Sequence, residues 1–314
     1  MEWEVVWIEW TQKYLSDLLS SAPGQVFAFI GSETGLLLVV LIVLFCWNKE
    51  AGKRLGLTIA AVNTWLPMIK SIVLRLRPYM EYPDRVKARA LMDKEAAEMD
   101  IVAQGYSFPS IHSASAAALS VSLALEIKKR WMWAAAMILT LLVGISRVVC
   151  GMHYPTDVLA GWAMGFAAVG IIALLEKKIK KEWVRHLILL ASALPGLFYV
   201  RTQDYFTSLG LLIGLIAVIP FERRYVRFQN TKSILAMILR TLFAFGIYFV
   251  LNTLLKMPFS REFLDSESLG ALLIRTARYA VIIFVMFGIY PMIFPWYEKL
   301  ACGVGALLRN HKET

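Results

Sequence analysis

Cysteine and histidine are scarce in this sequence. The three cysteines show no CxxC spacing and no even count, so they predict neither a disulfide framework nor a zinc site. We expect Cys46, Cys150 and Cys302 to be free thiols. The four histidines form no cluster with cysteine or carboxylate residues at ligand spacing, so no metal and no other cofactor is expected. Residues 1–4 lack the positive charge of a cleavable signal peptide, which predicts that the first helices stay in the mature protein.

Hydrophobic residues, in contrast, make up 58% of the 314 residues, and the mean hydropathy is +0.60. The core of a soluble protein needs a smaller hydrophobic fraction, so the chain is expected in a lipid bilayer. Several apolar stretches reach the roughly 20 residues that a helix needs to cross about 30 Å of hydrocarbon. The net charge is +10, but the basic residues form short clusters between these stretches, as membrane topology signals do. Nucleic acid is therefore not an expected partner.

The predicted fold class is all-α, a polytopic bundle of about nine transmembrane helices. The apolar stretches lie at residues 27–47, 56–76, 110–127, 131–149, 156–175, 186–200, 205–221, 233–255 and 269–295. An amphipathic helix over residues 3–18 precedes them and is expected to lie in the membrane interface. Its apolar residues at helical spacing are Trp3, Val6, Trp7, Trp10, Tyr14 and Leu18.

Basic clusters occupy alternate connections between the predicted crossings. They lie at residues 49–54, 128–130, 177–185, 223–232 and 299–312. By the positive-inside rule these connections face the cytoplasm. The other side then receives the N-terminal helix, the turn at 148–155 and the long connection 77–109, whose length is typical of a functional or disordered loop.

A first unusual polar block is Lys70-(x)6-Arg77-Pro78. A separation of seven residues is two helical turns, so Lys70 and Arg77 are expected on one face of a helix that Pro78 ends. Lys70 would lie about 10 Å below Arg77 along the axis. A cation at that depth is costly and indicates function; the alternative is a pair of anchors that extend to the membrane surface.

A second block, Ser107-Phe-Pro-Ser-Ile-His112, precedes an apolar run. Pro109 suits the first turn of a helix, which would leave backbone N–H groups near Ser110 and Ile111 pointing outward at the positive end of the helix dipole. That is a phosphate-binding geometry, and His112 follows in the same turn. A simple helix cap is the alternative interpretation.

A third block is Ser146-Arg147-(x)5-His153-(x)3-Asp157. Pro155 marks a helix start, so His153 is expected just outside the helix and Asp157 in its first turn. Asp157 could then orient one ring nitrogen of His153 and leave the other as a free lone pair. This is the arrangement of an activated nucleophile. All three blocks fall at outward ends of predicted crossings two to five.

Together the blocks resemble the three signature motifs of the type 2 phosphatidic acid phosphatase superfamily. Their order and spacing match over residues 25–176, with one departure at Ile111, where many members have glycine. The resemblance implies that Lys70, Arg77 and Arg147 clamp a phosphate, beside Ser110 and the backbone N–H of Ile111. A backbone N–H survives the change to isoleucine, although the larger side chain narrows the entrance.

The resemblance also implies catalytic roles. His153 would be the nucleophile that forms a phosphohistidine, Asp157 its orienting partner, and His112 the acid that protonates the leaving oxygen. Phosphoryl transfer depends on positioning and charge neutralisation, which three cations supply without a metal.

The resulting hypothesis is a membrane phosphatase acting on a phosphorylated lipid at the outer face of the plasma (inner) membrane. It predicts an interfacial helix over 1–24, a catalytic core over 25–180 and further helices of unknown role over 181–314. Expected substrates are isoprenoid pyrophosphate, which we favour, phosphatidylglycerol phosphate, phosphatidic acid and sphingoid phosphate. Alternatives that keep the site are a lipid phosphotransferase and a sugar phosphate phosphatase. An alternative of another class is a lipid transporter or flippase.

Overall fold

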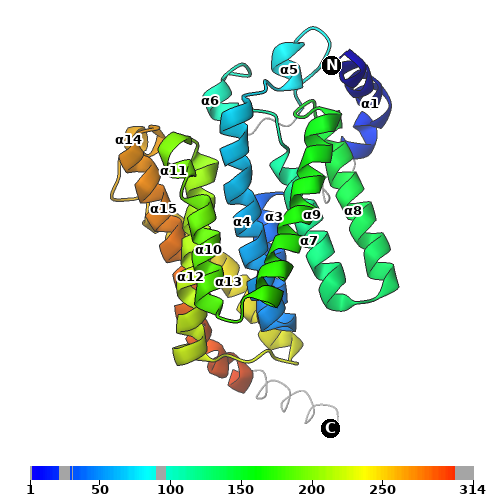
Figure 1. Ribbon diagram of the computed structural model, residues 1–314. Helices are drawn as coiled ribbons and strands as arrows, with labels where there is room; N and C mark the ends of the chain where they lie inside the picture. Colours follow the sequence, from blue (N-terminus) through cyan, green and yellow to red (C-terminus); the bar gives the residue numbers. More distant parts are fainter. Residues whose placement is uncertain (1, 21–28, 30, 90–96, 301–314) are drawn as a thin grey trace, which may run out of the picture. The chain divides into compact units, whose positions relative to one another are not determined.

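The computed structural model describes residues 2–20, 29, 31–89 and 97–300, and every regular element within them is helical (Figure 1). The chain divides into two compact units. The first unit comprises Met1–Leu36 and Thr58–Tyr205, and the second comprises Leu37–Leu57 and Phe206–Thr314. The all-α class is as predicted. Cys302 and the basic residues beyond 300 lie outside the described residues.

Most of the helices follow one another with short connections, and a longer one separates Glu81 from Ile101. Their bounds are α1 Glu2–Ser20, α3 Glu33–Ile42, η1 Val43–Trp47, α4 Lys49–Val73, α5 Pro78–Glu81, α6 Ile101–Gln104, α7 Ile111–Ile127, α8 Arg130–Val149, α9 Pro155–Lys178, α10 Glu182–Ala193, α11 Gly196–Tyr199, α12 Gln203–Phe221, η2 Glu222–Val226, α13 Ile234–Leu254, α14 Arg261–Asp265, α15 Leu269–Phe284, η3 Val285–Ile289 and η4 Tyr290–Ile293.

Six segments of the described chain are long and apolar enough to cross a membrane. They are Lys49–Glu81, Arg130–Val149, Pro155–Lys178, Gln203–Val226, Ile234–Leu254 and Leu269–Leu300. The predicted count of nine is not confirmed, because three predicted crossings correspond to shorter helices. Two are the apolar segments Glu33–Trp47 and Ile111–Ile127; at about 1.5 Å per residue, 17 residues fall short of about 30 Å. The third is interrupted at Leu194 and Pro195, between α10 and α11.

Small residues let α9 lie close against α7 in the first unit. A Cβ on Gly161 would come within 2.6 Å of the Ser110 carbonyl oxygen, and one on Gly165 within 2.3 Å of the Ala114 carbonyl oxygen. Close backbone approach of this kind is typical of helices packed in membranes. It brings the first turns of α7 and α9 together, and the Ser110 N–H donates to the carbonyl of Asp157 at 3.0 Å.

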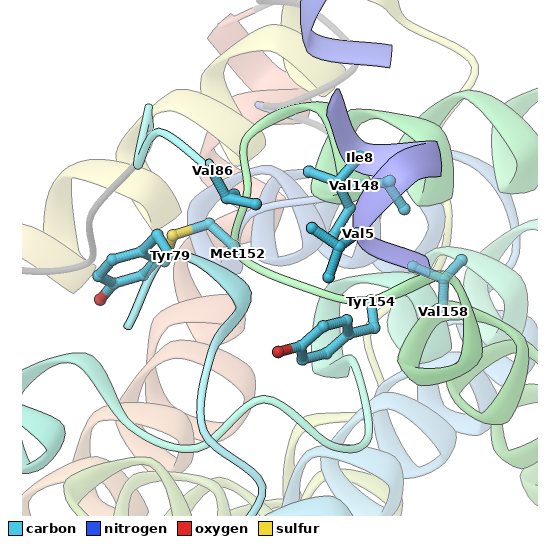
Figure 2. Packing of buried hydrophobic residues seen from close by; sticks show 8 residues of the cluster. All are labelled: Val5, Ile8, Tyr79, Val86, Val148, Met152, Tyr154 and Val158. Atoms are coloured by element: carbon cyan, nitrogen blue, oxygen red, sulfur yellow. The ribbon is translucent and has the colours of Figure 1, made fainter. Parts of the chain in front are cut away.

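The N-terminal helix α1 is confirmed as a helix and packs against the first unit through a buried cluster. Figure 2 shows the cluster, which consists of Val5, Ile8, Tyr79, Val86, Val148, Met152, Tyr154 and Val158. Nearby, the buried Gln12 amide donates to the carbonyls of Lys87 (2.7 Å) and Val149 (3.0 Å). One face of α1 therefore holds the segment after α5 and the turn between α8 and α9.

The opposite face of α1 is aromatic and exposed. Trp3, Trp7, Trp10 and Tyr14 are each 52–58% exposed. The helix is thus amphipathic in an unusual sense, since its inner face packs on protein and its outer face carries large apolar rings. That the outer face lies in a membrane interface stays a prediction.

In the second unit, Phe45 of η1 lies among aromatic rings. Its ring centroid is 5.0 Å from that of Phe294 and 5.6 Å from that of Phe228. Beside them the buried Arg240 guanidinium lies 4.2 Å from the Phe294 ring and pairs with Glu298 at 2.8 Å. Aromatic packing and a neutralised cation stabilise this unit.

Candidate active site

The three sequence blocks meet at one end of the first unit. The Ser107 N–H donates to the Arg75 carbonyl at 2.8 Å, and the Ser110 N–H donates to the Asp157 carbonyl at 3.0 Å. Arg77 Nη1 donates to the Met152 carbonyl at 3.1 Å. Hydrogen bonds therefore connect the segment after α4, the start of α7 and the turn before α9.

Lys70 and Arg77 are not on one continuous helix, contrary to the sequence interpretation. Helix α4 ends at Val73, Leu74 has a left-handed φ of 53°, and Arg77 is extended before Pro78. A proline disfavours the helical conformation of the residue before it. Here Pro78 begins the short helix α5 instead of ending α4. The predicted 10 Å axial separation of the two cations therefore does not apply.

Both cations are nevertheless buried and held by neighbouring carbonyl groups. Lys70 Nζ donates to the carbonyl of Tyr106 and, at 3.4 Å, to that of Ser107. Arg77 Nε donates to the carbonyls of Gln104 and Gly105, both at 2.9 Å. For Lys70 these neutral carbonyl dipoles fix the ammonium group in position without cancelling its charge, which suits the binding of an anion.

Ser110 is the N-cap of α7, as the alternative interpretation of the second block expected. Its Oγ accepts from the Ser113 N–H at 3.4 Å and from the Ser113 hydroxyl at 2.9 Å. The Ser110 N–H is bonded to the Asp157 carbonyl and is not a free phosphate donor, contrary to prediction. The Ile111 N–H, in the first turn of the helix, lies at the positive end of the α7 dipole. His112 follows in the same turn, within electrostatic range of Arg147 and His153.

The third block forms the turn between α8 and α9. Arg147 is buried near the end of α8, with its Nε donating to Ser146 Oγ at 3.2 Å. Gly151 supplies the left-handed φ of 71° that the turn requires. His153 lies in the turn and Asp157 in the first turn of α9, and Nδ1 of the imidazole is 3.7 Å from Oδ2 of the carboxylate.

The environment of His153 strongly favours the neutral imidazole. Burial, together with the charges of Arg77 and Lys70, lowers the pKa of His153 to about 3, although Asp157 acts in the opposite direction. With Nδ1 toward Asp157, Nε2 can carry the lone pair. A neutral ring nitrogen beside buried cations can attack an electrophile that carries negative charge.

The contacts of three residues of this site escaped the sequence interpretation. The Ser107 hydroxyl donates to Asp157 Oδ2 and lies 3.5 Å from His153 Nδ1. Arg75 Nη1 donates to the other carboxylate oxygen of Asp157 at 2.7 Å. Glu4, from the distant helix α1, accepts from Arg75 Nη2 at 2.8 Å. Arg75 lies inside the first block and Ser107 begins the second, so both could have been suspected, whereas nothing in the sequence around Glu4 points to the site.

The arrangement has the chemistry of an oxyanion site. Lys70, Arg77 and Arg147 supply positive charge; His112 lies in electrostatic range of all three, and His153 in range of Lys70 and Arg77. Within the described part of the chain, no group of three or more His, Cys, Asp or Glu side chains could hold a metal ion. The site can therefore hold a phosphoryl group by its cations and place a ring nitrogen beside it.

Family models match most of the chain. The PAP2 superfamily model matches residues 51–181, which include all three blocks, and the model of the PAP2 superfamily phosphatase transmembrane extension matches residues 206–301. The second match gives the helices of the C-terminal part a family context that the sequence blocks could not supply.

Curated relatives match over shorter lengths. An undecaprenyl-diphosphatase of Sulfolobus acidocaldarius is 29% identical over 125 residues, covering 40% of this chain and 55% of the relative. Phosphatidylglycerophosphatase B of Bacillus subtilis is 35% identical over 85 residues, covering 24% of this chain and 42% of the relative. A lipid A 4'-phosphatase of Bacteroides thetaiotaomicron is 33% identical over 61 residues, covering 19% of this chain and 27% of the relative. The matches thus span about a quarter to a half of each relative's length.

No solved structure matches the chain significantly. Assignment therefore depends on the family models together with six apolar helices of membrane-spanning length, and these agree. The chain is an integral membrane protein of the PAP2 superfamily.

Proposed function

We propose that this protein is a metal-independent phosphatase that hydrolyses a phosphorylated lipid through a phosphohistidine intermediate. The observation that carries the proposal is that buried Lys70 and Arg77 lie within electrostatic range of the neutral imidazole of His153, while His112 is within range of these two cations, of Arg147 and of His153. Such a site attracts a phosphate and presents a nucleophile to it. Substrates whose phosphate lies at a membrane surface suit a site at the ends of membrane helices.

In the first step, Nε2 of His153 attacks the phosphorus and the bond to the leaving oxygen breaks. The three cations neutralise the charge on the equatorial oxygens, as positioned cations do in phosphoryl transfer. His112, in its protonated form in the substrate complex, donates its proton to the leaving oxygen, a contribution of about 10²–10⁴ in rate for general acids.

In the second step, water attacks the phosphohistidine. His112 removes a proton from that water, the P–N bond breaks, and inorganic phosphate leaves. Asp157 holds Nδ1 of His153 throughout and stabilises positive charge on the ring while the P–N bond exists. The resting separation of 3.7 Å between Nδ1 and Oδ2 is expected to shorten in the substrate complex.

The substrate class follows from the relatives' names. Undecaprenyl-diphosphatase, phosphatidylglycerophosphatase B and lipid A 4'-phosphatase share a lipid phosphate as substrate. We favour an isoprenoid pyrophosphate, since the undecaprenyl-diphosphatase match covers the largest share of this chain among the relatives described above.

The site is proposed to open to the outer face of the plasma membrane. Basic residues concentrate in the connections 128–130 and 177–185, at the ends of α7, α8 and α9 opposite to those that form the site. The exposed rings of α1 would then lie in the outer interface, where tryptophan and tyrosine are enriched. Residues 1–24 are accordingly proposed as an interfacial segment attached to a catalytic core over 25–180, although 21–24 lie outside the described residues.

The test is turnover by purified protein of isoprenoid pyrophosphate, phosphatidylglycerol phosphate, phosphatidic acid, sphingoid phosphate and a short-chain sugar phosphate. We expect wild type to release phosphate from a lipid substrate in excess chelator, vanadate to inhibit it, and His153→Ala to abolish it. His186→Ala is the matched control, because His186 is also buried in the first unit but belongs to α10. Full activity in His153→Ala, or loss with chelator, would contradict the mechanism.

A further inference from the structure

Asp157 is held from two sides by different kinds of partner. Its Oδ2 accepts from the Tyr154 N–H at 2.8 Å and from Ser107 Oγ, and faces His153. Its Oδ1 is 2.7 Å from Arg75 Nη1. Arg75 is itself fixed over the ring of Tyr154, with its central carbon 3.8 Å from the ring centroid. The carboxylate therefore has one oxygen toward the imidazole and one toward a rigidly placed guanidinium.

The far side of this guanidinium binds α1. Arg75 Nη2 is 2.8 Å from Glu4 Oε2, while Glu4 Oε1 accepts from the Thr156 hydroxyl at 2.6 Å. The same hydroxyl accepts from Arg75 Nη1 at 2.7 Å. Glu4 and Asp157 are 4% and 0% exposed. One cation thus lies between two buried carboxylates, and a hydroxyl completes the network.

We propose that Arg75 and Glu4 are positioning residues for phosphoryl transfer, acting through Asp157 on His153. The inference rests on the phosphatase function proposed above. The reason is electrostatic. Arg75 paired with Asp157 alone would neutralise the carboxylate that must stabilise charge on the imidazole. Because Glu4 shares the charge of Arg75, Asp157 keeps negative charge for His153.

The network also explains why an N-terminal helix belongs to the catalytic unit. Glu4 lies 153 positions from Asp157 in the sequence, yet it reaches Thr156, the neighbour of Asp157 in the first turn of α9. Helix α1 therefore contributes a carboxylate to the site as well as apolar packing. Neither residue touches the cations proposed to bind the phosphate, so their effect should fall on the chemical step.

The substitution Glu4→Gln tests this directly, because it keeps the size of the side chain and removes its charge. We expect kcat to fall about tenfold or more, the range for partners that orient a catalytic group from outside, while KM stays at the wild-type value. The kcat of Arg75→Lys should lie between those of wild type and Arg75→Ala, since lysine keeps the charge but loses the fork geometry of the guanidinium. In an Asp157→Asn background, Glu4→Gln should have no further effect.

Glu9→Gln is the matched control, because it makes the same substitution at another glutamate of α1. Glu9 pairs with the exposed Arg85 at 2.7 Å and has no contact with Asp157. Wild-type kcat in Glu4→Gln, or an equal loss in Glu9→Gln, would overturn the inference. The second result would mean that α1 acts only by docking, which melting temperatures would also reveal.

An imidazole nitrogen spectrum makes the test independent of turnover. The ¹⁵N shifts of His153 should move in Glu4→Gln and stay in place in Glu9→Gln, and unmoved shifts in Glu4→Gln would overturn the inference. Wild-type protein that turns over no lipid phosphate would instead contradict the proposed function, and the spectrum would still decide the role of Glu4.

Discussion

The two units treat buried positive charge differently. In the second unit, Lys49 and Lys53 pair with Glu222 at 3.0 and 2.7 Å, and Arg240 pairs with Glu298. In the first unit, Lys70 and Arg147 have carbonyl and hydroxyl partners, and among the described residues neither has a carboxylate at ion-pair distance. Buried charge without a counter-ion is costly, so it indicates a place where a ligand supplies the counter-ion.

Arg75 marks the boundary between these two kinds of cation within the first unit. It lies a few residues from Lys70 and Arg77, but two carboxylates neutralise it. A paired arginine can hold another residue in place, whereas a cation such as Lys70, held by carbonyl oxygens, retains charge for an anion. This difference separates the proposed positioning role of Arg75 from the proposed phosphate-binding role of Lys70 and Arg147.

The sharpest test of the comparison is removal of one cation from each unit. Lys70→Met or Arg147→Met should lower kcat/KM about 10²–10³-fold, because each removes a preorganised charge that stabilises the transition state. Arg240→Met, a buried cation of the second unit, should leave kcat/KM near wild type. A comparable loss in Arg240→Met would show that the second unit takes part in the reaction.

Anion binding should stabilise the protein through the first unit. Orthovanadate at one hundred times its dissociation constant is expected to add about 2.7 kcal/mol to the free energy of unfolding. The rise in melting temperature should disappear in Lys70→Met and persist in Lys53→Met. An anion effect that survives Lys70→Met would place the binding elsewhere.

The same pair of substitutions should change stability in opposite directions without a ligand. Lys70→Met replaces a buried charge that lacks a counter-ion, so the free energy of unfolding should rise by about 1–2 kcal/mol. Lys53→Met removes one of two partners of the buried Glu222, so the free energy of unfolding should fall by about 1–2 kcal/mol. Thermal melts in detergent measure both, and a destabilised Lys70→Met would contradict the comparison.

Sequence patterns predicted the helical class and most of the long helices, since a membrane span is a local property of about 20 residues. They failed where a local break competes with hydrophobicity. The crossing predicted at 186–200 ends early near Pro195, and α4 ends at Val73 although apolar residues continue. Nothing in composition distinguishes Leu74, with its φ of 53°, from a helical leucine.

The site could be anticipated only where its residues lie in short blocks at helix ends. The structure brings the blocks together, and the roles assigned to their residues stay predictions. Glu4 could not be anticipated, because its contact with Arg75 depends on how α1 packs through Val5 and Ile8. The free N–H predicted at Ser110 was wrong for a related reason, since close packing of α9 on α7 brings the Asp157 carbonyl to it.

The smallest expected effect concerns the charge state of His153. Its pKa lies near 3, below the usual 6.5, so the ring is neutral above about pH 4 and the unfolded chain binds its proton first as pH falls. Stability from this group is therefore complete above about pH 6.5 and is lost as pH falls toward 3. Lys70→Met removes one of the positive neighbours and should raise the pKa, while Arg240→Met should leave it unchanged. NMR titration of the imidazole measures the pKa of His153 in wild type, Lys70→Met and Arg240→Met. Protonation of wild-type His153 near pH 6.5, or an unchanged pKa in Lys70→Met, would contradict a site in which burial and neighbouring cations together keep the imidazole neutral.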